Sequence, residues 1–306
     1  MSNATDRGCI LYECLQEPSS NIFTFLPWAV SVLTIPANAI QFGFLRTKFR
    51  CEINTLFVII QNLCLADLLC GISTFITILI KFLQWKVISN QSGVTLITQF
   101  LSQWVAPYFF MVSTIILNAL AILKMFKVTN NVLHGRKFVR RLCYCMWGII
   151  FVPSTINYTL HRENIIERKL SQIFIPLLVF PSIFLQCYCF GRIWYTTSRK
   201  VKRISKRADG KVRFIDKFLK IAGLQILAFV LCQSPVSASY LLRNINVGEK
   251  IRLIFVGIAQ FQSVIDPVMF FIVFRHKWKR PQRQEVAVKF NLRLAYVIPR
   301  PKLGEP

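Results

Sequence analysis

The chain has 306 residues, of which 54% are hydrophobic and 27 are phenylalanine, and its mean hydropathy is +0.48. This apolar content lies outside the range of soluble domains and predicts a polytopic membrane protein. The net charge of +25 would also suit a nucleic-acid-binding protein, but topology signals that also contact anionic lipid headgroups explain it better.

Seven apolar runs are each long enough to cross about 30 Å of hydrocarbon as a helix. Membrane strands alternate in polarity, whereas these runs are apolar on all sides, so we expect helices. The runs occupy residues 22–45, 54–83, 95–123, 138–158, 171–196, 214–241 and 251–274.

The predicted fold is an all-α, seven-transmembrane helix bundle that fills most of the chain. We expect an extracellular N-terminal segment at 1–21, a transmembrane domain at 22–274 and a cytoplasmic tail at 275–306. The first run has no signal peptide before it and is expected to act as an uncleaved signal.

Charge and glycosylation sequons agree on the orientation. With the N-terminus outside, 29 of the 38 Lys and Arg residues fall on the cytoplasmic side, as the positive-inside rule requires. The N-x-[ST] sequons at Asn3, Asn90 and Asn157 all fall on the other side. These observations predict a multi-pass plasma-membrane protein whose N-terminus is extracellular.

An acidic residue, Asp67, lies inside the second run. An ionised carboxylate at that depth costs roughly 2.5 to 3.5 kcal/mol on the insertion scale, so it needs a compensating interaction. The run reads "NTLFVIIQNLCLADLL" and resembles the second helix of the rhodopsin-like (class A) G-protein-coupled receptors. Their signature N-L-x-x-A-D-L matches Asn62, Leu63, Ala66, Asp67 and Leu68.

Three further runs carry parts of the same resemblance. The seventh matches the family's [ND]-P-x-x-[YF] motif at Asp266, Pro267 and Phe270. In the family a short amphipathic helix follows, and the resemblance implies one here, beginning with Phe274, Arg275 and Lys277. The sixth matches C-W-x-P at Cys232 and Pro235 only. Asn38 in the first run and Trp147 in the fourth stand where the family keeps an Asn and a Trp.

The resemblance implies a sodium site around Asp67. In such receptors the helix-two Asp and polar groups from helices three and seven hold a hydrated sodium ion, and the matching residues here are Ser113, Ser263 and Asp266. The alternative is that the carboxylates hydrogen-bond to backbone, with Asp266 serving the helix interrupted by Pro267. No other cofactor is expected.

The resemblance also implies a conformational switch. Pro235 and Pro267 should kink the sixth and seventh helices, so that the sixth can swing its cytoplasmic end. Phe270 ends the seventh-helix motif, and Gln233 replaces the family's Trp with an amide that needs partners.

The cytoplasmic face departs from the family. Leu123-Lys124-Met125 stands where Asp-Arg-Tyr is usual, and Lys lacks the planar fork of Arg. We expect Lys124, Arg136 and Arg140 to face a heterotrimeric G protein, and Lys124 to pair with Asp216 in the resting state.

The extracellular side gives less information. Cys9 and Cys14 are the cysteines on the oxidising side and are candidates for a mutual disulfide. Ala106 replaces the acidic residue of amine receptors, so a peptide or neutral small molecule is favoured over an amine. The expected ligand-pocket residues are Gln99, Gln103, Trp104, Tyr108, Tyr240 and Gln260.

The sequence bears on three alternatives to a signalling receptor. An enzyme is disfavoured because the three His residues lack metal-ligand spacing and no catalytic motif occurs. An ion- or proton-coupled transporter or channel would use intramembrane acids, but no repeat relates the halves of the chain. A non-signalling decoy of receptor fold is the third alternative, and the sequence does not separate it from a working receptor.

Overall fold

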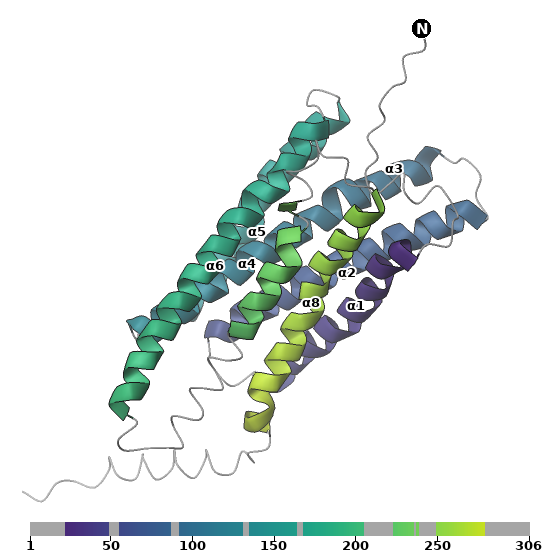
Figure 1. Cartoon of the computed structure of the whole chain (residues 1–306). Coiled ribbons are helices and arrows are strands. Elements are labelled where there is room, and N and C mark those ends of the chain that lie inside the picture. The colour runs from purple at the N-terminus through teal and green to yellow at the C-terminus, as the bar shows by residue number, and fades with distance from the viewer. Residues whose placement is uncertain are drawn as a thin grey trace, which may run out of the picture. The chain divides into compact units, whose positions relative to one another are not determined.

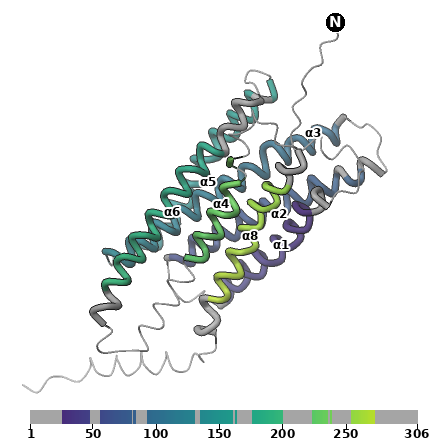
Figure 2. The backbone as a smooth tube through the Cα atoms, viewed as in Figure 1, coloured from purple at the N-terminus to yellow at the C-terminus, as the bar shows by residue number. Residues whose placement is uncertain are grey.

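The computed structural model describes residues 22–48, 55–86, 92–130, 135–163, 168–204, 223–235, 237–238 and 249–278. Nearly all of these residues are helical, and Figure 2 traces their backbone. The statements below concern these residues.

The first half of the described chain contains three long helical stretches. Helix α1 spans Ile22–Lys48 and α2 spans Thr55–Lys86. The third stretch is continuous and has three parts: α3 at Ser92–Phe100, the π-helical turn η1 at Leu101–Val105 and α4 at Ala106–Thr129. The predicted run at 95–123 is therefore one helix with an irregular turn inside it.

The second half contains three long helices and one shorter helical segment. Helix α5 spans Arg136–Arg162, α6 spans Arg168–Ile204 and α8 spans Glu249–Trp278. The helical segment Gly223–Pro235 precedes α8 and is drawn in green in Figure 1. The chain divides into compact units at Val268, and the polar site described below lies in the first unit, Met1–Val268.

Five of the described helices are long and apolar enough to cross a membrane, as expected of a multi-pass membrane protein. Helix α5 and the segment Gly223–Pro235 coincide with the fourth and sixth predicted runs but are not among the five. The first turns of α5 carry Arg136, Lys137 and Arg140, which lower its hydropathy. The five spans are Leu26–Thr47, Leu56–Ile80, Gly93–Thr129, Pro176–Arg199 and Ile254–Ile272.

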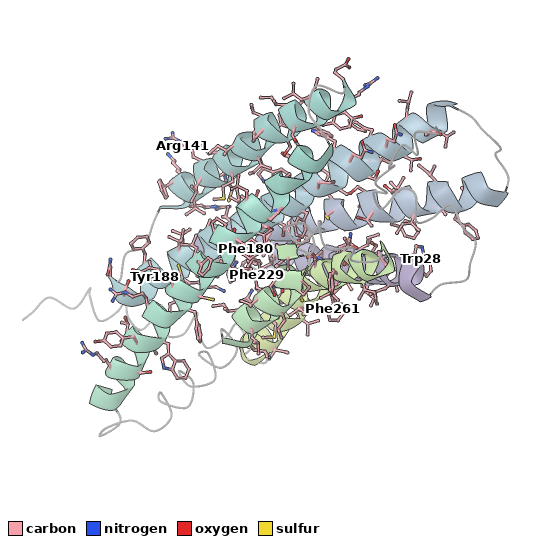
Figure 3. The ribbon with its side chains drawn as sticks, turned by 45° about the horizontal axis from the view of Figure 1, so that its top comes forward. Trp28, Arg141, Phe180, Tyr188, Phe229 and Phe261 are labelled. Atoms are coloured by element: carbon pink, nitrogen blue, oxygen red, sulfur yellow. The ribbon has the colours of Figure 1, made fainter. Side chains whose placement is uncertain are left out.

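Helices α2 and α4 organise the packing. Helix α2 packs against α1 and α4, and α4 packs also against α5 and α6, as Figure 1 shows. The apolar faces of α2, α4 and α5 meet in one core cluster, which includes Phe229 from the segment Gly223–Pro235. Figure 3 labels this buried ring, together with the exposed aromatic residues Tyr188 of α6 and Phe261 of α8.

Close packing between α1 and α2 depends on Gly71. A Cβ atom at this position would lie 3.1 Å from Thr34 Cγ2, closer than ordinary van der Waals contact. The Thr34 hydroxyl donates to Val30 O, 2.8 Å away in its own helix. Its polar atom is thereby satisfied inside α1, and its methyl group is left to pack against α2.

Candidate functional site

The carboxylate of Asp67 lies buried between three helices. Its side chain in α2 is 1% exposed. One oxygen, Oδ1, accepts a hydrogen bond from Ser113 Oγ of α4 at 2.6 Å and another from Ser263 Oγ of α8 at 2.9 Å. Hydrogen bonds to a carboxylate are stronger than those between neutral groups, so Asp67 links α2, α4 and α8.

Pro267 adds a link between α8 and α1. Proline has no backbone N–H, so the carbonyl four residues earlier, at Ser263, loses its usual helical donor. Asn38 of α1 replaces that donor, because its Nδ2 donates to Ser263 O at 2.8 Å as well as to Thr34 O at 3.0 Å. The side chain and the backbone of Ser263 therefore bind two different helices.

Asp266 has a separate set of partners. It is 7% exposed, and its Oδ1 accepts hydrogen bonds from Gln225 Nε2 and from Gln262 Nε2, each at 2.9 Å. The expected alternative, in which Asp266 serves the backbone freed by Pro267, does not describe this arrangement, because Asn38 serves that carbonyl and amides serve Asp266.

Lys124, which was expected to face a G protein, is half-buried and is directed at the same amide, that of Gln225. Its Nζ donates to Gln225 Oε1 at 3.4 Å. Gln225 therefore lies between the ammonium group of Lys124 and the carboxylate of Asp266. The expected partner, Asp216, lies outside the described residues, so its pairing with Lys124 stays a prediction.

The polar network around Asp67 and Asp266 contains buried oxygens without a hydrogen-bond donor. Several buried side-chain oxygens have no hydrogen-bond partner among the described residues, and three of them belong to residues of this polar network: Asn38 Oδ1, Asp67 Oδ2 and Gln262 Oε1. Unfilled buried oxygens need a donor or a cation, and oxygen ligands suit a hard cation. Asp67 Oδ2 and the hydroxyl oxygens of Ser113 and Ser263 form a set of oxygen ligands that fits sodium.

Three further side-chain hydrogen bonds join helices. Trp147 Nε1 of α5 donates to Asn62 Oδ1 of α2 at 3.3 Å. Asn118 of α4 donates through Nδ2 to Ser182 Oγ of α6 at 2.6 Å and accepts from Gln186 Nε2 of α6 at 3.1 Å. These contacts tie α2 to α5 and α4 to α6.

The expected switch residues fall in different places. Gln233 is buried and its Nε2 donates to Ala259 O of α8 at 3.4 Å, but its Oε1 has no partner among the described residues. Pro235 is the last residue of the segment Gly223–Pro235. Phe270, in the last part of α8, packs edge-on against the ring of Phe271.

At the start of α5, Arg136 and Arg140 are both exposed. This exposure leaves their guanidinium groups accessible to another molecule, as a G-protein contact would require.

The expected pocket residues on the third helical stretch gather around η1. Gln99 of α3 and Gln103 of η1 are half-buried. Trp104 of η1 stacks on Phe100 and on Tyr108, at ring-centroid distances of 5.0 and 5.7 Å. Its buried Nε1 has no partner among the described residues, and π-helical turns are frequent at functional sites.

Two other pocket residues each donate a hydrogen bond to another helix, although Gln260 Oε1 has no partner among the described residues. The hydroxyl of Tyr108 donates to Trp147 O at 3.1 Å. Gln260 Nε2 of α8 donates to Thr74 Oγ1 of α2 at 3.2 Å. Both residues therefore hold helices together, whatever they contribute to a ligand.

One of the three expected glycosylation sites, Asn157, lies in α5. The other two sequons, the cysteine pair and two further residues lie outside the described part of the chain: Asn3, Asn90, Cys9, Cys14, Asp216 and Tyr240.

Gln225 and Gln262 were missed by the sequence analysis. Gln262 precedes Asp266 by four residues, which places both on one helix face, so the spacing was a usable signal. Gln225 belongs to another helix, and nothing in the sequence indicated that it faces Lys124 and Asp266.

No protein-family model matches the chain, and no curated protein matches it. The fold and site define a multi-pass helical membrane protein with a buried polar core. The receptor resemblance therefore depends on the sequence motifs and the contacts described above.

The Asp67 cluster predicts that Ser263→Ala destabilises the protein. The change removes one donor from a buried carboxylate, which costs about 1 to 3 kcal/mol. Thermal unfolding of the purified protein measures the effect. Ser31→Ala is the matched control, because Ser31 is also buried but donates only to Pro27 O in its own helix. Equal melting temperatures for the two variants would contradict the prediction.

Proposed function

We propose that the chain is a G-protein-coupled receptor of the rhodopsin-like class, with seven transmembrane helices and an extracellular N-terminus in the plasma membrane. Its ligand would be an extracellular peptide or neutral small molecule, and its cytoplasmic partner a heterotrimeric G protein. The support comes from motif residues that were chosen from the sequence and that make contacts in the structure.

The observation that carries the proposal is the three-helix contact of Asp67. Asp67 was matched to the family's helix-two acid, Ser113 to helix three and Ser263 to helix seven. The carboxylate accepts hydrogen bonds from both hydroxyls. Two serines matched in two other runs would seldom both bind the carboxylate of Asp67 by chance.

Two further matched pairs support the same proposal. Asn38 binds the backbone of α8 at Ser263, and Trp147 binds Asn62. Asn38, Asn62 and Trp147 all stand at positions where the sequence resembles the family.

Signalling would require movement of the helix that contains Pro235. Gln233 contacts Ala259 of α8 through a single 3.4 Å hydrogen bond, which is long for an N–H donor. A weak contact of this kind between the sixth and seventh predicted helices is suited to a switch, because it gives little resistance to separation.

The function is tested by G-protein activation in cells without added ligand. We expect basal activation above that of untransfected cells, and stronger activation for Lys124→Arg, which restores the guanidinium fork. Surface expression of each variant, measured by an N-terminal epitope tag, is the control. A protein that reaches the surface but stays silent in both forms, with every class of G protein, would favour the decoy hypothesis.

The proposed topology is tested by glycosylation. Glycosidase treatment of the expressed protein should increase its electrophoretic mobility, because Asn3, Asn90 and Asn157 are expected to carry glycans on the extracellular side. Replacing all three by Gln should remove the shift. Glycosylation of a sequon introduced into the basic stretch 199–213 would overturn the orientation.

A bound sodium ion is the third part of the proposal. Asp67 Oδ2 and the hydroxyl oxygens of Ser113 and Ser263 would hold it, and its charge would balance the carboxylate of Asp67. Asp266, the fourth residue of the expected site, is hydrogen-bonded to Gln225 and Gln262 instead. Sodium should raise the melting temperature by about 2 to 4 °C over a bulky organic cation, if the linkage is about 1 kcal/mol.

The same measurement includes its own controls. Asp67→Asn should abolish the difference between the two salts at matched ionic strength. Ser234→Ala should preserve it, because Ser234 donates to Val230 O in its own helix. Equal melting of the unmodified protein in both salts would count against the ion.

A further inference from the structure

A second charged pair lies in the described core, apart from Asp67. The ammonium group of Lys124 is in the last third of α4, and the carboxylate of Asp266 is in α8. No direct ion pair joins either group to an opposite charge within the part of the chain that the structure describes. A charge among apolar helices is costly unless something compensates it.

Gln225 lies between these two charges and faces each with the appropriate atom. Its carbonyl oxygen Oε1 accepts from Lys124 Nζ at 3.4 Å, and its amide nitrogen Nε2 donates to Asp266 Oδ1 at 2.9 Å. A glutamine amide has an acceptor at one end and a donor at the other. Its dipole is therefore aligned with the field between the cation and the anion.

We propose that Lys124, Gln225 and Asp266 form a cation–amide–carboxylate relay. In this relay Lys124 is the built-in counter-charge of Asp266, and Gln225 connects the two. The three residues come from α4, from the segment Gly223–Pro235 and from α8, so the relay joins three helical elements. The proposal concerns stability and conformation, and it holds whether or not the protein is a receptor.

The environment strengthens such a relay. Asp266 is 7% exposed, and hydrogen-bonded groups polarise one another more strongly where water is scarce. Gln262 donates to the same carboxylate oxygen from one helical turn away, so Oδ1 is held from two sides. Lys124 itself is half-buried. Removing either charged group leaves the other without its opposite, while removing both leaves neither uncompensated.

The relay predicts that Lys124 and Asp266 are energetically coupled. The test is a double-mutant cycle on the purified full-length protein, with Lys124→Met and Asp266→Asn and thermal unfolding as the readout. Each single variant should lower the melting temperature by about 3 °C or more. The double variant should melt no lower than the less stable single variant.

The other buried carboxylate supplies the matched control. Asp67 accepts hydrogen bonds from Ser113 and Ser263, whereas Lys124 donates to Gln225, so the shifts of Lys124→Met and Asp67→Asn should add. Additive shifts for Lys124 and Asp266 would overturn the relay. Equal coupling of Lys124 to both carboxylates would also overturn it, because a diffuse charge effect would then suffice.

The connecting role of Gln225 is tested in the same assay. In a Gln225→Leu background, which keeps the volume but removes both polar atoms, the coupling between Lys124 and Asp266 should fall by at least half. Unchanged coupling would exclude the amide as the connection. If Asp266→Asn does not fold, the cycle between Lys124→Met and Gln225→Leu gives the same decision: coupling supports the relay and additivity overturns it.

Discussion

The need to satisfy a buried carboxylate governs the polar core of this protein. Asp67 is in the middle of a long apolar helix, where an uncompensated charge is costly. Its hydrogen bonds fix Ser113 of α4 and Ser263 of α8 at one place. Because Pro267 frees the carbonyl of that same serine, Asn38 brings α1 to the site as well. One acidic side chain and one missing backbone N–H thus set how four helices meet.

Amide side chains make most of the remaining side-chain hydrogen bonds between the described helices. Gln186, Gln225, Gln233 and Gln260 each donate a hydrogen bond to a different helix from their own. Within membranes such bonds contribute only about 0.6 kcal/mol on average, so stability is shared among many contacts. This arrangement makes the relative position of the helices specific without making any single contact indispensable.

The helices were predictable because length and apolarity alone require them in a bilayer. The ends of the helices were less predictable. Helix α6 continues to Ile204, well past the predicted end at residue 196. A helix that has already formed extends into polar sequence, which a hydropathy window does not include. The meeting of Asp67 with Ser113 and Ser263 was predictable only through the family resemblance. The role of Gln225 was not predictable, because it depends on how three separate helices are rotated about their axes. The sequence of a single apolar run does not determine that rotation.

The π-helical turn η1 affects how this chain is compared with others. The N–H of Ala106 bonds to Leu101 O, five residues earlier, so the turn contains one residue more than an α-helical turn. Each residue of an α-helix advances about 100° around the axis, so a count from Ser113 outward loses register on passing η1. A count that ignores the extra residue assigns Gln99 to the side of the helix that Thr98 occupies. Thr98 is fully buried. A sequence alignment with any uninterrupted helix therefore needs a one-residue gap within Leu101–Val105 before the outer residues are compared.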